Sequence, residues 1–140
     1  MTAPNDMAQL HALCFDAPPP WRAEDFASCL SSPLVFVLAD AQGVACGFAL
    51  GRVVADEAEL LTLAILPTLR RQGRGRALLA QFHSQARQRG AQSAFLEVSA
   101  RNTAACALYV AAGYQPVGRR AGYYGPGHDG VVMRLGLDAG

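Results

Sequence analysis

The segment Leu69–Gly75, LRRQGRG, places two glycines among arginines directly before an apolar helical pattern. Gly73 and Gly75 lack a Cβ atom, so another molecule can approach their backbone closely. The first turn of a helix offers unpaired N–H groups and the positive end of the helix dipole. These features predict an anion site suited to phosphate. Additional positive charge would come from the side chains of Arg70, Arg71, Arg74 and Arg76.

This segment differs from two other phosphate-binding loops. No Gly-Lys-Ser/Thr sequence follows it, so it is not a P-loop. The third glycine of a dinucleotide-binding fingerprint is missing as well. Taken alone, the spacing R-x-x-G-x-G is also compatible with a purely structural turn before a helix.

A carboxylate and a phenol are the other candidate reactive groups. Glu97 lies in the apolar segment Ser93–Ala100, where strand alternation places it on one face with Phe95 and Ser99. A carboxylate in a central strand is costly unless it is paired or solvated. Glu97 is therefore either an acid bonded to an arginine or the backbone, or a functional group. Tyr109 lies in a helical segment, where an aromatic residue is commonly part of the core.

Changes in hydrophobic period predict the elements that position these residues. Two short helices over 6–15 and 22–31 precede three meandering antiparallel strands over 34–40, 44–54 and 59–66. A helix over 75–89, a strand over 93–100, a helix over 103–112 and two final strands follow. This order predicts an α/β fold with a mixed central sheet, antiparallel N-terminal strands and helices on both faces. The strands 59–66 and 93–100 should be parallel neighbours.

The composition indicates a single globular domain over residues 1–140, with 51% hydrophobic and 16% charged residues. No apolar run is long enough to cross a membrane, and no secretory signal is visible, so we expect a cytoplasmic protein. The three histidines are far apart in sequence, and no metal site is predicted. Reduced core thiols are expected at Cys14, Cys29, Cys46 and Cys106.

Charge is unevenly distributed, although the net charge is only +1. Residues 1–69 hold two arginines against eight acids, a net −6, and residues 70–140 hold ten arginines against three acids, a net +7. The near-neutral total, with no aromatic residues interleaved among the basic ones, argues against nucleic-acid binding. An acidic cluster of Asp56, Glu57 and Glu59 either solvates a hairpin or attracts a basic peptide.

The order of these motifs resembles the GNAT acetyltransferase superfamily. The R-x-x-G-x-G segment, after a strand and a proline, resembles its coenzyme A diphosphate loop. LEVSARNTAACALYVAAGY (96–114) is similar to its LEVRxxNxxAxxLYxxxGF segment, in particular to that of the RimI branch. Members of that branch acetylate the N-terminal residue of a small-subunit ribosomal protein. The resemblance is strong over residues 57–120 and fainter in PPPWRAEDF and over 119–133.

The resemblance implies that acetyl-CoA, without a metal, binds in a wedge between the strands 59–66 and 93–100. Backbone groups of Leu63, Ala64 and Ile65 would pair with the pantetheine arm. The diphosphate would be bound by Arg70, Arg71, Gln72, Gly73, Arg74, Gly75 and Arg76. Asn102 would contact the cofactor, cap the following helix, or do both.

The resemblance also implies roles in the reaction. Glu97 would act as general base toward the amine, and Tyr109 would protonate the departing thiolate. The acceptor would be a protein N-terminus, as on a ribosomal protein, and the enzyme a monomer or weak dimer that binds neither nucleic acid nor membrane. The peptide-side wall would be formed by Tyr123, Tyr124 and His128.

Two other interpretations stay open at the level of sequence. A GNAT enzyme could act on a small-molecule amine or an antibiotic, and a CoA-binding module could lack catalysis. The chain departs from the family pattern in two places that shape the acceptor site in relatives. The usual first strand is absent or very short, and Gly-Tyr-Tyr-Gly-Pro-Gly follows Ala121 in place of the family's Asn-Tyr-Tyr segment.

Overall fold

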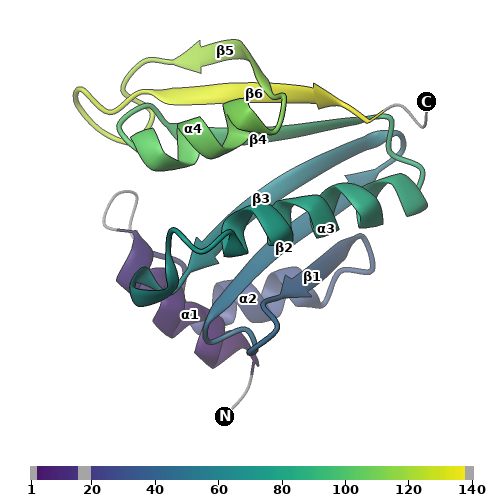
Figure 1. Ribbon diagram of the computed structural model, residues 1–140, viewed down its shortest axis with the longest axis vertical. Coiled ribbons are helices and arrows are strands. Elements are labelled where there is room, and N and C mark those ends of the chain that lie inside the picture. The colour runs from purple at the N-terminus through teal and green to yellow at the C-terminus, as the bar shows by residue number, and fades with distance from the viewer. Residues whose placement is uncertain (1–2, 16–19, 138–140) are drawn as a thin grey trace.

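The computed structural model describes residues 3–15 and 20–137 (Figure 1). Helices α1 (Ala3–Cys14) and α2 (Ala23–Leu30) precede strands β1 (Val35–Ala39), β2 (Gly47–Val54) and β3 (Glu57–Ile65). A 3-10 turn (Pro67–Leu69) leads to α3 (Arg74–Gln88), β4 (Ser93–Ser99) and α4 (Thr103–Ala111). Strands β5 (Gln115–Arg120) and β6 (Gly130–Gly136) complete an order that confirms the predicted one.

Some predicted bounds are wrong where turns compete with regular structure. The first helix begins at Ala3, three residues before the predicted start. Residues 44–46 form turns instead of the beginning of β2, because Gly43 takes a left-handed φ of 104° and its carbonyl accepts from the Cys46 amide. The predicted proline-rich loop at 17–20 lies almost entirely outside the described residues.

The six strands form one mixed sheet in the order β1-β2-β3-β4-β6-β5. Strands β3 and β4 are parallel, as predicted, and the other neighbouring pairs are antiparallel. The parallel ladder is short and runs from the pair Glu57–Ser93 to the pair Leu60–Leu96. Further along, β3 pairs with β2 and β4 pairs with β6, and Figure 1 shows the two strands diverging.

A bulge marks the place where β3 leaves β4. Leu50 of β2 pairs with Thr62 and its neighbour Gly51 pairs with Leu60, so Leu61 is an extra residue in β3. A bulge bends its strand and increases the local twist. The sheet is therefore split at one end, between residues 61–65 of β3 and residues 97–99 of β4.

Helices cover both faces of the sheet, which confirms the predicted fold class. Alternate residues of β2 enter different cores: Phe48 packs with α1 and α2, whereas Ala49 packs with α3. Figure 1 shows α3 and α4 in front of the sheet and α1 and α2 behind it. Tyr109 of α4 shares the front core with Leu96 and Val98 of β4.

Candidate active site

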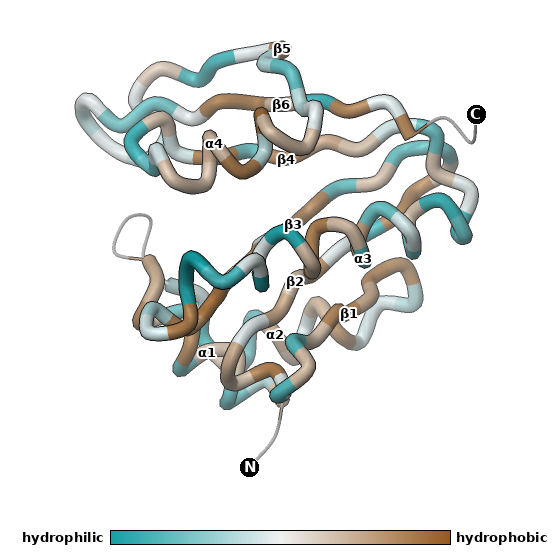
Figure 2. The backbone as a smooth tube through the Cα atoms, viewed as in Figure 1, coloured by the Kyte–Doolittle hydropathy of each residue, from teal (hydrophilic) through white to brown (hydrophobic). Residues whose placement is uncertain are grey.

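The loop before α3 has the backbone geometry of an anion site. Gly73 is the N-cap of α3, with a left-handed φ of 77°, and no side chain accepts from the first turn. Arg71 also takes a left-handed φ, of 64°, which costs a non-glycine residue about 1–3 kcal/mol. Figure 2 shows this loop among the most hydrophilic parts of the chain. The amides at the start of α3 are thus free of side-chain caps and surrounded by basic residues.

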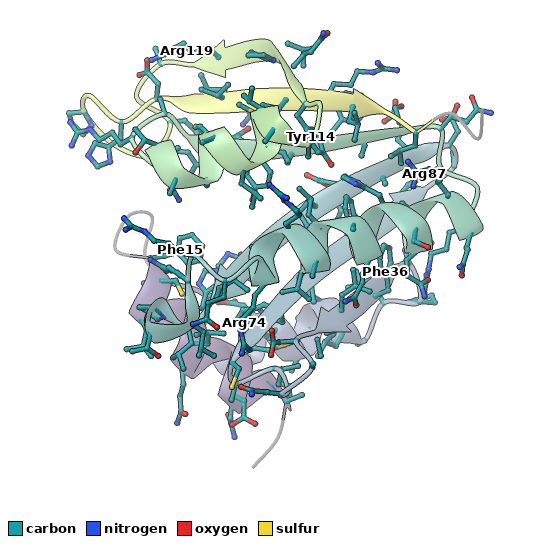
Figure 3. The ribbon with its side chains drawn as sticks, in the orientation of Figure 1. Phe15, Phe36, Arg74, Arg87, Tyr114 and Arg119 are labelled. Atoms are coloured by element: carbon teal, nitrogen blue, oxygen red, sulfur yellow. The ribbon has the colours of Figure 1, made fainter. Side chains whose placement is uncertain are left out.

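The four arginines of the loop have different surroundings. Arg74 donates from Nη1 to Oδ2 of the buried Asp40 at 2.7 Å, so it ties the loop to the β1–β2 turn (Figure 3). Arg70 donates from Nε to the carbonyl of Ile65 at 3.3 Å. Within the described residues, Arg71 and Arg76 are exposed and make no ion pair, which leaves their guanidinium groups available to a phosphate.

Gly75 brings the loop against the other predicted cofactor residues. A Cβ atom at this position would lie 3.4 Å from Leu108 of α4, 3.9 Å from Leu63 and 4.0 Å from Ile65 of β3. From this point a groove of about 390 Å³ extends between α3 and α4. It is lined by Arg76, Leu79, Ala80, His83, Leu108, Ala111 and Ala112. Gly75 therefore lies beside the split end of β3, and Leu108 is shared between its surroundings and the interhelical groove.

Asn102 has the capping role that was one of its two predicted functions. Its side-chain oxygen accepts from the Ala105 amide at 3.1 Å, at the first turn of α4. A contact between Asn102 and the cofactor stays a prediction.

Glu97 lies on the sheet face opposite α4, because its neighbours Leu96 and Val98 enter the front core. Its carboxylate Oε1 lies 3.3 Å from Nε of Arg120, and its side chain is 22% exposed. Oε2 faces Gly130, where a Cβ atom would come within 3.1 Å of it. The pairing of the acid with an arginine is thus found, and a role of Glu97 as general base stays a prediction.

Tyr124 lies close to Glu97, because a Cβ atom at Gly130 would come 3.1 Å from Oε2 of Glu97 and 3.3 Å from the Tyr124 ring. Burial raises the pKa of Tyr124 to about 12, and the negative charge of Glu97 adds to this increase. Burial also raises the pKa of Tyr109, with smaller contributions from Cys106 and Tyr124. Tyr109 is 7% exposed and stays protonated at neutral pH. The two sequence-predicted acid–base candidates thus approach β4 from opposite faces, and Tyr124 of the β5–β6 loop lies beside Glu97.

The β5–β6 loop is held by contacts that the sequence does not reveal. Asp129 accepts from Arg119 Nε at 2.7 Å and from the Gly122 amide at 2.9 Å. Arg101, just before α4, donates from Nε to the carbonyl of Gly127 at 3.2 Å. These bonds fix the loop that carries Tyr123 and Tyr124, whose rings pack edge to face.

Two residues of the acidic cluster, Glu57 and Glu59, lie on the same sheet face as Glu97 but nearer the start of β4, since they pair with Ser93 and Phe95. Glu57 and Glu59 line a groove of about 490 Å³ that also contains Phe95, and Glu59 pairs with Arg52. Phe95 precedes Glu97 by two residues, about 7 Å along the strand. The negative charges of this groove can therefore attract the following residues of a peptide whose N-terminus lies at Glu97.

Among residues 3–15 and 20–137, no group of three His, Cys, Asp or Glu side chains is placed to hold a metal ion. The four cysteines are free thiols and half-buried, and Cys14, Cys29 and Cys106 pack against the two cores. No described helix has the length and apolar character needed to cross a membrane.

Comparison with known proteins decides the family. The sequence pattern of the Acetyltransferase (GNAT) family matches residues 5–114. The chain belongs to the GNAT acetyltransferase family. This acetyltransferase is 39% identical, over 120 residues, to the [ribosomal protein bS18]-alanine N-acetyltransferase of Escherichia coli K12, covering 83% of this chain and 80% of that one. It is 37% identical over 133 residues to N-alpha-acetyltransferase RimI of Mycobacterium tuberculosis, covering 91% and 82%.

The fold of this acetyltransferase matches a solved relative as well. The crystal structure of the ribosomal-protein-S18-alanine N-acetyltransferase from Escherichia coli superposes with a TM-score of 0.84 and 30% identity. The match covers 98% of this chain and 89% of that chain. These similarities confirm the resemblance to the RimI branch, and acetyl-CoA is the cosubstrate of the family.

A Gly75→Ala variant should separate cofactor binding from folding. The new methyl group meets ordinary van der Waals contacts in the protein, and alanine favours a helix, so the melting temperature should not fall. The same methyl group points toward Leu63 and Ile65, where it would narrow the space predicted for the pantetheine arm, and we expect the KM for acetyl-CoA to rise about tenfold. Gly136→Ala, in open space at the end of β6, is the matched control. An unchanged KM would argue against a cofactor at this helix.

Two buried histidines should make the stability of this acetyltransferase depend on pH. His83 bonds the Tyr114 hydroxyl at 2.8 Å, and burial, helped by Arg87, lowers its pKa to about 4; burial does the same for His11. Below about pH 6.5 the unfolded chain binds protons that the folded chain does not. The free energy of unfolding should therefore decrease as pH falls from about 6.5 to about 4. Urea titrations of wild type and His83→Gln should show a weaker pH dependence in the variant.

Proposed function

We propose that this acetyltransferase moves the acetyl group of acetyl-CoA to the N-terminal α-amine of a protein, by direct attack of the amine on the thioester. The observation that carries the proposal is the split between β3 and β4 beside the uncapped start of α3, with Glu97 at the split end of β4 and Tyr109 packed against the same strand from α4. The 39% identity to an enzyme named for acetylating a protein's alanine supports the same reaction.

The cofactor would lie across three neighbouring surfaces. The inner edge of β3 at Leu63, Ala64 and Ile65 would pair with the pantetheine arm as an added strand does. The amides at the start of α3, with Arg71 and Arg76, would hold the diphosphate. Arg74 would act through Asp40, by fixing the loop rather than by touching the phosphate. The groove between α3 and α4 offers the nucleotide an apolar surface beside Arg76.

The acid–base chemistry would follow from the surroundings of each group. An α-amine has a pKa of about 7.7–8.0 and is roughly one tenth neutral at pH 7, whereas lysine is neutral less than about one part in a thousand. Glu97 would take the proton of the α-ammonium and release the nucleophile. Tyr109, whose pKa is raised by burial, would stabilise the thiolate first by a hydrogen bond and transfer its proton late.

The acceptor we propose is a ribosomal protein N-terminus in the cytoplasm, because the relatives from Escherichia coli are named for that substrate. The groove lined by Glu57 and Glu59 supports this choice, since it would attract basic residues that follow the acetylated one. The walls nearest the amine would be Tyr123, Tyr124 and His128.

A thiol-release assay with a panel of acceptors tests the function. The panel contains alanine-initiated peptides with basic or neutral following residues, the same peptides with a blocked N-terminus and an internal lysine, and small amines including aminoglycosides. Turnover that requires a free peptide N-terminus is expected. Turnover with small amines alone would identify a small-molecule acetyltransferase, and acetyl-CoA binding without any turnover would identify a non-catalytic module.

A further inference from the structure

Arg120 fills a site built to hold a cation. Its Nε lies 3.3 Å from Oε1 of Glu97, and its Cζ lies 4.7 Å from the centre of the Tyr123 ring. A carboxylate on one side and an aromatic face on the other are the two partners that bind an ammonium group in proteins. Gly130 borders the site without a side chain, and a Cβ atom at this position would lie 3.3 Å from the rings of both Tyr123 and Tyr124. A substrate α-ammonium would meet the same partners.

We infer that Arg120 holds the place of the acceptor's α-ammonium in the free protein and is exchanged for it on binding, so that it sets specificity for charged N-termini. The inference rests on the proposed function, in which Glu97 receives that amine. Arg120 touches no reacting atom itself; it acts by occupying Glu97 until a second cation arrives.

The contact has the properties of an exchangeable one. The Arg120 side chain is 56% exposed and approaches Glu97 through Nε, not through the two parallel bonds of a strong arginine–carboxylate pair. An ion pair this exposed contributes little free energy. The released guanidinium can remain over Tyr123 or move into solvent, because all residues of β5, an edge strand, are exposed.

No other described cation competes for Glu97. The neighbouring Arg119 points to Asp129 at 2.7 Å, and Arg134 of β6 lies over Phe95 at 5.9 Å. Two tyrosines of the β5–β6 loop, Tyr123 and Tyr124, lie next to Gly130 and Glu97. Burial and the negative charge of Glu97 raise the pKa of Tyr124 to about 12, so its hydroxyl stays protonated at pH 7.

The exchange explains why the acceptor N-terminus can bind in its protonated form, although only its neutral form can attack the thioester. The arriving α-ammonium supplies the charge that replaces Arg120 at the carboxylate. One proton then passes from its nitrogen to Glu97, and the neutral amine with its lone pair is left to attack the thioester carbon. An acceptor without a positive charge would leave Arg120 in place.

Kinetics of Arg120 variants with an alanine-initiated peptide test the exchange. Arg120→Ala should lower the peptide KM roughly two- to fivefold, the effect expected for loss of a half-exposed ion pair, and leave the KM for acetyl-CoA unchanged. Arg120→Lys, which keeps the charge, should stay near the wild-type peptide KM. Arg89→Gln, at the far end of α3 over Phe36, controls for the change in net charge.

Inhibition by methylguanidinium distinguishes the exchange from a purely structural role of Arg120. Methylguanidinium should inhibit Arg120→Ala competitively with the peptide, because it refills the empty site, and it should affect the wild type much less. An unchanged or higher peptide KM in Arg120→Ala, or equal inhibition of both proteins, would overturn the inference. Arg120→Met, which keeps the apolar stem over Tyr123, replaces Arg120→Ala if that variant does not fold.

Glu97→Gln in the same assay distinguishes the two possible failures. If it loses turnover while the Arg120 variants behave like wild type, the exchange is wrong and the proposed function stands. If it keeps full turnover, the assignment of Glu97 as the base is wrong and the exchange loses its basis.

Discussion

Replacing Glu97 with glutamine is expected to lower kcat/KM for a peptide acceptor about 10²- to 10⁴-fold, the usual contribution of a positioned general base. Glutamine keeps the shape of the side chain and can still fit beside Gly130, but it cannot accept a proton. The KM for acetyl-CoA should change little, because the cofactor contacts proposed above lie on β3 and α3. Steady-state thiol release with each substrate varied in turn measures both quantities.

The deficit of Glu97→Gln should also shrink as pH rises. Near pH 9 most α-amines are already neutral, so less depends on the base. Glu24→Gln, an exposed carboxylate of α2 in a surface pair with Arg22, is the control for charge. A loss below about tenfold at pH 7 would mean that water or another group removes the proton.

Replacing Tyr109 with phenylalanine is expected to lower kcat about 10²- to 10³-fold while the peptide KM stays close to the wild-type value. The phenylalanine ring should keep the packing of the Tyr109 ring in the front core. The variant therefore loses only the hydroxyl group that would donate a hydrogen bond to the leaving thiolate. In the described part of the chain no hydrogen bond of the Tyr109 hydroxyl is found, and folding stability should therefore change by less than about 1 kcal/mol.

Tyr114→Phe is the matched control for this change. Its ring lies 5.9 Å from that of Tyr109, and it is also buried, but its hydroxyl bonds His83. Losing that bond should reduce the free energy of unfolding by about 1 kcal/mol with a small effect on kcat. Equal losses of kcat in both variants would show that Tyr109 contributes packing and no proton donor.

Local signals explain why the element order could be predicted. Each of these signals fixes the type or the end of an element from residues that are close in sequence. They are the hydrophobic period, Pro67 after β3, the asparagine cap at Asn102 and the glycine after α4. The alternation of β4 similarly placed Glu97 on the opposite face from Leu96. The motif spacing then indicated the family, and the comparisons confirmed it.

The remaining features depend on residues far apart in sequence. Arg74 looks like a phosphate ligand in the loop motif, yet it bonds Asp40, 34 residues earlier. The pairing of Glu97 with Arg120 requires the placement of β5 beyond β6, a sheet order that hydrophobic period does not encode. The bond between His83 and Tyr114, 31 residues apart, likewise has no local signature. Side-chain partners of this kind are set by the packed tertiary structure, not by propensity.

Because the ladder between β3 and β4 is short, a cosubstrate bound beside it would stabilise the folded protein. Four residue pairs join the half-sheet β1-β2-β3 to the half-sheet β4-β6-β5, and the rest of the seam depends on packing of α3 and α4. Acetyl-CoA bound between the two half-sheets would contact both of them. At a concentration 100 times its Kd, it would raise the free energy of unfolding by about 2.7 kcal/mol. When the concentration of acetyl-CoA in the cell falls, a larger share of this enzyme would thus be without cosubstrate and less stable. The lifetime of the enzyme would then depend on the supply of acetyl-CoA.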